Sequence, residues 1–240
     1  MLLQSFADQL ADIVAHARTV QPERTPTDFT SSAIDLKAYD NLLRTRGWKP
    51  ADVENVCPLT PFQQGLLLLA LTEPESQAYR VQMSFRVEGS IDPSRFEAAW
   101  RNVAQAHPML RSRFVHRDLD EPLRVVMHEM PASFSWHDLR AADAPARELA
   151  TTEVRKRDLS WGFDFEHGPL VRFNVFQLAE NHWRVVWSYH HILLDGWSLG
   201  VVLTDLASAY AGTEVPPGPD PAVLIKWLAT RAGSASIEWW

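Results

Sequence analysis

The sequence predicts an α/β domain in which a layered sheet is flanked by helices. Residues 81–87 alternate between apolar and polar side chains, which is typical of a strand with one buried face. Residues 93–107 carry apolar side chains at helical spacing, and Asp92 and Pro93 suit the N-cap and the first turn of that helix. Strand and helix patterns continue to alternate along the chain, which indicates a layered α/β fold.

The first 55 residues predict a separate helical tail and a linker. Residues 1–18 have the apolar spacing of an amphipathic helix, which we assign to the tail of an upstream domain. Residues 19–55 are rich in proline and polar residues, and we interpret them as a linker with one short helix, 35–46, that ends at Gly47. We expect the main domain to span residues 56–240.

Further elements of the main domain follow from the same patterns. We expect strands at residues 123–128, 170–178 and 183–190, and a charged helix at 147–159. Ser198 is the expected cap of another helix, closed by Gly212. A proline-rich loop, 215–221, and a last helix from Ala222 complete the prediction.

The composition excludes several classes of function. The 240 residues are 46% hydrophobic and 22% charged, with a formal net charge of −7. Because binding to phosphates needs clustered positive charge, we expect no nucleic-acid partner. The single cysteine, Cys57, requires no oxidising compartment, no signal peptide is visible, and the longest aliphatic run, 65–71, is too short to span a bilayer. These features predict a cytoplasmic protein without membrane contact.

The segment Tyr189–Ser198 carries the strongest signal for chemistry. It contains the spacing His190-His191-x-x-x-Asp195-Gly196 at the point where a strand ends and a helix begins. If the strand stays regular, His191 shares a face with Tyr189 and His190 lies on the opposite face, so only one imidazole enters a given cleft. The alternative is a pair of core histidines followed by an Asp-Gly turn.

His191 is the candidate catalytic residue of this segment. An imidazole accepts or holds a proton near neutral pH, and a positioned acid–base group contributes about 10² to 10⁴ in rate. We expect Asp195 either to orient the ring or to hold the loop through an arginine, and Gly196 to allow a sharp turn beside the site.

Other site chemistries have no pattern in this sequence. The remaining histidines are scattered without zinc-ligand spacing, and there is neither a glycine-rich phosphate loop nor a G-x-S-x-G elbow. Cys57 stands in an apolar context that favours a buried structural thiol. We therefore expect no metal and no intrinsic cofactor.

Four segments together resemble the condensation domains of nonribosomal peptide synthetases. These are the histidine segment extended by Trp197-Ser198, residues 57–67 (CPLTPFQQGLL), residues 107–114 (HPMLRSRF) and residues 163–172 (FDFEHGPLVR). They occur in the order of that family, in which 57–67 corresponds to the first motif and 107–114 to the second. Ala106 departs from the second motif, where arginine is usual. Val223-Leu224 depart from a further, fourth motif of the family, where an aromatic residue is usual before Trp227.

The resemblance implies a chloramphenicol-acetyltransferase-like α/β fold, with this chain as one lobe of a two-lobe domain. It implies amide formation between a donor thioester and an acceptor amine, with His191 as the catalytic residue. The structural or supporting residues would be His190, Asp195, Gly196, Trp197, Ser198 and Arg111. Upstream and downstream peptidyl carrier proteins would be the partners and would supply phosphopantetheine, and a C-terminal lobe would complete the domain.

Two further details follow from the resemblance. Residues 25–29 (TPTDF) resemble the end of an epimerization domain, and residues 74–79 resemble the condensation subtype that accepts a D-configured donor. Because a complete condensation domain is about twice as long, we expect the chain as given to be an incomplete, inactive half. The alternatives are a non-catalytic fragment that binds carrier proteins, and a homo-oligomeric CoA-dependent acetyltransferase.

Overall fold

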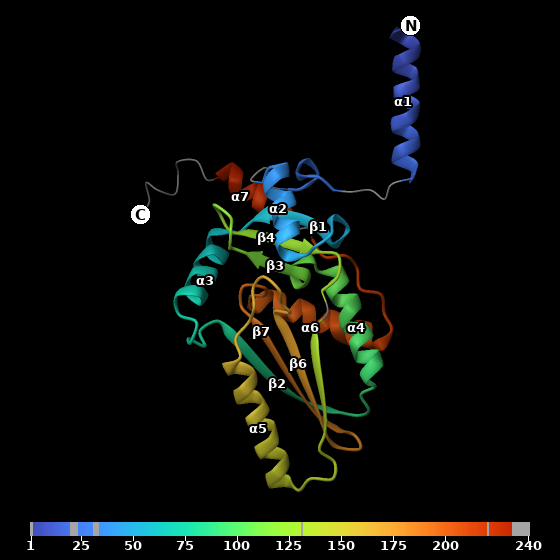
Figure 1. Ribbon diagram of the computed structural model, residues 1–240. Helices are drawn as coiled ribbons and strands as arrows, with labels where there is room; N and C mark the ends of the chain where they lie inside the picture. The colour runs from blue at the N-terminus through green and yellow to red at the C-terminus, as the bar shows by residue number, and fades with distance from the viewer. Residues whose placement is uncertain (1, 20–23, 31–33, 131, 220, 232–240) are drawn as a thin grey trace.

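The computed structural model contains two sheets surrounded by helices (Figure 1) and describes residues 2–19, 24–30, 34–130, 132–219 and 221–231. The α-helices are α1 (Leu2–Thr19), α2 (Leu36–Arg46), α3 (Pro61–Thr72), α4 (Pro93–Ala106), α5 (Ala144–Ser160), α6 (Gly196–Ala211) and α7 (Pro221–Arg231). The strands are β1 (Val53–Pro58), β2 (Arg80–Glu88), β3 (Ser112–Val115), β4 (Leu123–Met127), β5 (Ser133–Asp138), β6 (Val171–Ala179) and β7 (His182–His190). Short 3-10 helices are η1 (Pro26–Asp28), η2 (Pro50–Asp52) and η3 (Pro108–Arg111).

The larger sheet has the strand order β2-β7-β6-β5. Its first three strands pair antiparallel, whereas β5 runs parallel to β6. The predicted strands at 81–87, 170–178 and 183–190 lie in β2, β6 and β7 and are confirmed. The edge strand β5 was not predicted, because it is a short segment with only two large apolar side chains.

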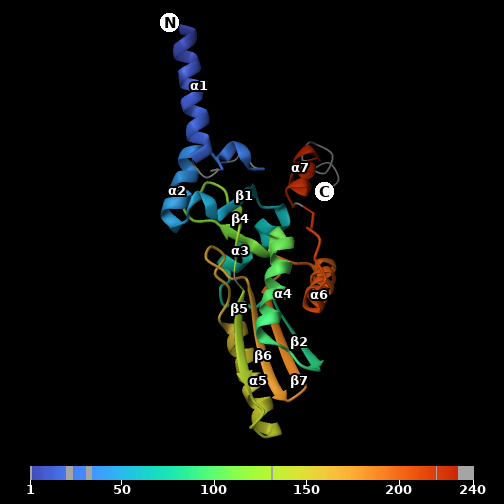
Figure 2. The same ribbon diagram turned by 90° about the vertical axis from the view of Figure 1, so that its right-hand side faces the viewer.

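The two faces of the larger sheet carry different kinds of side chain. One face presents large apolar side chains such as Phe173 and Trp187, which pack against Trp100 of α4, while Leu206 of α6 belongs to the same core. The opposite face presents polar side chains to α5, including Arg172, which forms an ion pair with Asp158 at 2.6 Å. The result is a three-layer arrangement, helices, sheet and helix, which Figure 2 shows from the side.

The smaller sheet, β1-β4-β3, encloses a second core together with part of the predicted linker. Phe29 and Ile34 are buried, as are Tyr39 and Leu42 of α2, and they pack in one cluster with apolar residues of this sheet. Strand β1 also begins at Val53, inside the segment interpreted as a linker. The reason is that a few well-spaced apolar residues suffice to join a core when a sheet face lies beside them.

Helix termini follow local rules, with one correction to the predicted caps. Gly47 closes α2 with φ +67°, as expected for the left-handed region. Helix α6 begins at Gly196 and its N-cap is Asp195, whose side chain accepts a hydrogen bond from the Ser198 backbone N–H. The expectation that Ser198 caps this helix is therefore wrong, because the helix starts three residues earlier than expected and aspartate is an equally good cap.

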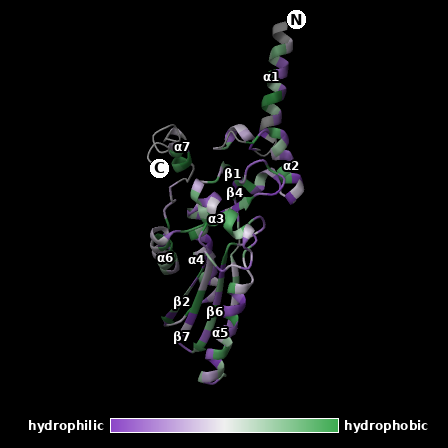
Figure 3. Cartoon of the chain, turned by 90° about the vertical axis from the view of Figure 1, so that its left-hand side faces the viewer, coloured by the Kyte–Doolittle hydropathy of each residue, from purple (hydrophilic) through white to green (hydrophobic). Residues whose placement is uncertain are grey.

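Helices α1 and α7 lie at the periphery of the molecule. Helix α1 projects away from both sheets in Figures 1 and 2, and its apolar side chains Phe6, Leu10, Ile13 and Val14 are exposed. Figure 3 shows hydrophobic colouring on α1 and α7. On α7, the exposed apolar side chains are Val223, Leu224 and Trp227.

Candidate active site

The histidine segment forms a tight turn between β7 and α6. Strand β7 stays in register with β2 up to the pair Arg80 and His190, and the His191 backbone N–H then donates to the Tyr79 carbonyl at 2.8 Å. A hydrogen bond from the Leu193 N–H to the His190 carbonyl, 3.0 Å long, closes the turn. The segment is thus held by backbone bonds on both sides of the two histidines.

His190 is a buried, neutral residue. It is 2% exposed, and its ring lies edge-on to Phe163 and Phe165 at centroid distances of 6.0 and 4.8 Å. Burial lowers the pKa of His190 to about 4, assisted by the positive charge of Arg80 and by His191. As expected from the sequence, His190 shares the face of Arg184 and Ser188, because β7 stays regular to its last residue.

His191 lies just beyond the strand and is partly exposed. Its Nδ1 atom is enclosed and has no hydrogen-bond partner among the described residues. The Tyr79 ring lies 6.3 Å from the imidazole, with the two planes at 84°. The enclosed Nδ1 leaves Nε2 as the ring nitrogen that a substrate can reach.

Asp195 and Gly196 have simpler roles in the structure than those expected from the sequence. Asp195 accepts a hydrogen bond from the Ser198 N–H at 2.8 Å, and this bond is the main reason why its pKa lies below the usual value. Among the described residues Asp195 forms no ion pair with an arginine, so of the two alternatives the arginine-held loop has no support, and orientation of the His191 ring stays a prediction. Gly196 has an ordinary φ, and a Cβ placed there meets nothing within 4 Å, so no sharp turn depends on it.

The remaining candidate residues lie in different surroundings. Trp197 is 90% exposed, and Ser198 lines a cavity described below. Arg111 does not belong to the turn: it is 3% exposed, forms an ion pair with Glu54 at 2.5 Å and donates to the Ala104 carbonyl at 2.9 Å. Arg111 therefore ties the end of α4 to the smaller sheet.

The structure brings the four sequence motifs together around the two histidines. Gln63 of the first motif is buried, and its Nε2 donates to the Ile192 carbonyl at 3.3 Å. Met109 of the second motif places its sulfur 3.8 Å from the same amide nitrogen. The segment at 163–172 supplies the two phenylalanines that enclose His190. Segments as much as 129 residues apart thus fix one turn.

Gln63 and Tyr79 contact the turn, although the sequence analysis, which placed them in the segments 57–67 and 74–79, predicted no contact of either with the histidines. A signal for Gln63 was present, because Thr60 and Gln63 form a capping box at the start of α3, with bonds of 3.1 and 3.2 Å. The resemblance of the segment 74–79 does not indicate the contact of Tyr79 with His191, which arises through the pairing of β2 with β7. Cys57 is buried as expected, and Arg124 donates to its sulfur at 2.9 and 3.2 Å.

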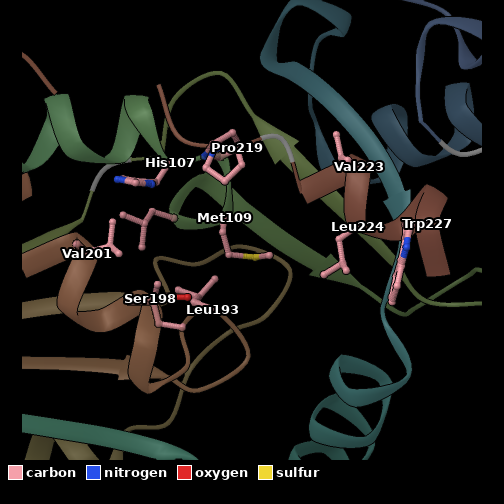
Figure 4. A pocket seen from close by; sticks show the side chains of 13 residues that line it. His107, Met109, Leu193, Ser198, Val201, Pro219, Val223, Leu224 and Trp227 are labelled. Carbon is pink, nitrogen blue, oxygen red and sulfur yellow. The ribbon is translucent and has the colours of Figure 1, made fainter. Parts of the chain in front are cut away.

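A cavity of about 760 Å³ lies beside the turn, between α6, η3 and α7. Figure 4 shows Leu193, Ser198 and Val201 on one side and Leu224 and Trp227 on the other. His191 does not line this cavity. The lining is mostly apolar, so the cavity suits an apolar group rather than a charged one.

Two other kinds of site are absent from the part of the chain that the structure describes. No group of three or more His, Cys, Asp or Glu side chains is arranged there to hold a metal ion. None of the described helices is both long enough and apolar enough to cross a membrane.

Comparison with known proteins agrees with the motifs. Residues 53–239 match the family described as Condensation domain. One component of the linear gramicidin synthase of Brevibacillus parabrevis is 34% identical over 100% of this chain, and a second component of that synthase is 38% identical over 99%. Bacitracin synthase 3 of Bacillus licheniformis is 31% identical over 100% of this chain. The chain spans only 3 to 5% of the length of these relatives.

Solved structures give the same fold. The starter condensation domain of rhizomide synthetase RzmA is similar with a TM-score of 0.66 and 25% identity, over 75% of this chain and 46% of that one. The first condensation domain of the calcium-dependent antibiotic synthetase shares the fold, with a TM-score of 0.65 and 20% identity over 76% of this chain and 47% of that one. These likenesses confirm the predicted α/β fold of the chloramphenicol acetyltransferase type. The chain belongs to the condensation-domain family of nonribosomal peptide synthetases.

Proposed function

We propose that this chain is the N-terminal lobe of a condensation domain that joins a carrier-bound donor thioester to a carrier-bound aminoacyl acceptor. The observation that carries the proposal is the position of His191, which is partly exposed just beyond the end of β7 and has its Nδ1 enclosed. The family relationship supports the same reaction.

In this reaction the acceptor nitrogen forms a bond to the thioester carbonyl carbon while the carbon–sulfur bond breaks. The proton lost by the amine ends on the departing thiol of the donor's phosphopantetheine. His191 Nε2 is placed to accept a hydrogen bond from the amine and to relay that proton. Because an α-amine has a reference pKa of about 7.7 to 8.0, part of it is already unprotonated at neutral pH, and orientation by His191 contributes alongside proton transfer.

The other motif residues support His191 in this proposal. His190 fills the space under the turn, Asp195 starts α6, and Arg111 holds the smaller sheet against α4. Gly196 keeps the approach to the turn free of side-chain atoms. Neither a metal nor an intrinsic cofactor takes part.

The surface beside the turn is the proposed contact with a C-terminal lobe. Trp197 and Val201 are one helical turn apart on α6, and both are exposed. Of these two, Val201 lines the apolar cavity, together with Val223 and Leu224 of α7. The solved relatives are about twice as long as their matched part, which leaves a second half of similar size to cover this surface.

The proposal extends to the segments on either side and to the partners. Upstream and downstream peptidyl carrier proteins would deliver the two substrates, the donor would have the D configuration, and residues 1–18 would be the helical tail of an epimerization domain. Residues 19–55 would connect this tail to the lobe at 56–240. Part of this connection, including Phe29, Ile34 and Leu42, packs into the core of the smaller sheet.

The test is amide formation from a donor-loaded and an acceptor-loaded carrier protein. The 240-residue chain alone is expected to be inactive, and the chain extended by its natural downstream sequence is expected to form the amide. His191→Ala should abolish product in the extended protein, while Phe6→Ala, a distant exposed substitution, should not. Turnover by the short chain with acyl-CoA would instead identify a self-assembling acetyltransferase. Carrier binding without turnover by the extended protein would identify a non-catalytic binding module.

A further inference from the structure

Tyr79 contacts His191 through both its backbone and its ring. Its carbonyl accepts the His191 N–H at 2.8 Å, which continues the β2–β7 pairing one residue past Arg80 and His190. Its ring stands edge-on to the imidazole, 6.3 Å between centroids and 84° between planes. Aromatic pairs favour this edge-to-face arrangement.

The backbone of Tyr79 adopts a conformation that aromatic residues rarely use. Its φ is +63°, in the left-handed region that favours glycine. The loop before it supplies the constraint: the Arg80 N–H donates to the Gln77 carbonyl at 3.1 Å, and the Arg80 guanidinium donates to the Pro74 carbonyl at 2.6 Å. Residues held in this backbone region cluster at functional sites, where the surrounding structure fixes the position of a reactive group.

Core packing does not explain an aromatic side chain at this position. Tyr79 is 42% exposed and does not belong to either buried cluster. Its ring contact in the structure is with His191. The surroundings of the imidazole therefore account for the ring better than the stability of the domain does.

We propose that Tyr79 is a positioning residue for His191. Its carbonyl fixes the backbone of the histidine, and its ring restricts the imidazole to the orientation in which Nδ1 is enclosed and Nε2 faces the substrate. The effect of this contact on turnover rests on the proposed function, but the orientation of the ring does not, and the two can be measured separately.

The first measurement is an NMR spectrum of the 240-residue chain with isotope-labelled histidine, in which His191 is assigned by its loss in His191→Gln. Tyr79→Phe keeps the ring and is expected to leave the tautomer ratio of the His191 imidazole unchanged. Tyr79→Ala and Tyr79→Gly remove the ring and are expected to alter this ratio. Because glycine suits a φ of +63°, Tyr79→Gly separates loss of the ring from backbone strain. Phe6→Ala serves as the control for removal of an exposed aromatic ring.

The second measurement is amide formation by the extended domain. Tyr79→Ala and Tyr79→Gly are expected to lower kcat by about 10- to 100-fold, with little change in the KM for the acceptor, because a misplaced catalytic group costs about this much. Tyr79→Phe is expected to retain near-normal kcat.

Each outcome decides the proposal. Unchanged His191 signals in Tyr79→Ala and Tyr79→Gly would overturn it, as would an equal loss of kcat in Tyr79→Phe, which would assign the role to the hydroxyl. If His191→Ala keeps full activity while Tyr79→Gly still alters the imidazole signals, the proposed role of His191 fails and the positioning contact stands.

Discussion

The Nδ1 atom of His190 accepts a hydrogen bond from the backbone N–H of Ile192, 3.2 Å away, in the turn that follows β7. A protonated imidazole carries a hydrogen on Nδ1 and cannot accept this bond. The turn that presents His191 is therefore built on a neutral neighbour. Burial also favours the neutral imidazole, because it lowers the pKa of His190 to about 4.

This relationship predicts a specific loss of stability in mild acid. The unfolded chain binds a proton at His190 below its reference pKa of 6.5, whereas the folded chain does so only below about 4. Stability is therefore fully present above pH 6.5, falls as the pH drops from 6.5 to about 4, and then levels off. The gap corresponds to about 3 kcal/mol.

The measurement is urea unfolding between pH 4 and 7.5 for the wild-type chain and for His190→Asn. The asparagine oxygen accepts the same hydrogen bond but does not titrate. The wild type should lose about 3 kcal/mol more than the variant over this range, because other titrating groups contribute equally to both. Parallel curves would show that His190 is not held neutral.

Removal of the Asp195 side chain should destabilise α6. Asp195→Ala loses the hydrogen bond to the Ser198 N–H and should cost about 1 kcal/mol, whereas Asp195→Asn should cost much less. Because its pKa is lowered in the folded state, the contribution of Asp195 is present above its unfolded pKa and is lost as the pH falls through the folded value. Urea unfolding of the three proteins at neutral pH, and again in acid, measures both effects.

Asp143, which caps α5 by accepting from the Ala146 N–H at 2.9 Å, gives a matched control. Asp143→Ala should lose similar stability without affecting amide formation in the extended domain. If Asp195→Ala reduces turnover no more than Asp143→Ala does, Asp195 contributes only as a helix cap.

Substitution of Gly196 should affect the substrate rather than the fold. Gly196→Ala should keep or slightly raise stability, by at most about 1 kcal/mol, because the new Cβ meets no atom and φ is ordinary. Gly196→Leu should fold equally well but block amide formation in the extended domain. Thermal unfolding and product formation separate these effects.

Gly168 gives the opposite case for comparison. It has φ +62°, a backbone conformation that strains any residue with a Cβ, and the Met130 side chain would also have to move, so Gly168→Ala should be clearly destabilising. Strong destabilisation by Gly196→Ala, or normal turnover by Gly196→Leu, would contradict the assignment of Gly196 as an open approach to the turn.

Arg111 should be essential for the stability of the smaller sheet. Arg111→Ala leaves Glu54 and several carbonyl groups without their donor and should cost about 3 to 5 kcal/mol in the free energy of unfolding, measured in urea. Arg140→Ala breaks the exposed pair with Asp138 and should change stability little. Equal effects of the two substitutions would show that burial of Arg111 contributes nothing.

The secondary structure could be predicted where side-chain periodicity is strong. The alternation in 81–87 and the helical spacing in 93–107 correctly located β2 and α4. Strand β3 is short, and α3 carries apolar residues on several sides, so neither had a clear period and both were missed. Phe29 and Ile34 were assigned to a linker because isolated apolar residues show their partners only in three dimensions.

The α/β class, the family and the turn that carries His190 and His191 could all be inferred from the sequence, because periodicity and motif spacing are local properties of the chain. The contact of Gln63 with the Ile192 carbonyl and the place of Tyr79 beside His191 became visible only in the folded chain. Both contacts join segments more than 100 residues apart, and no local pattern encodes them. They arise because β2 pairs with β7, which places Tyr79 beside His191, and because α3 packs into the common core, which places Gln63 beside the Ile192 carbonyl.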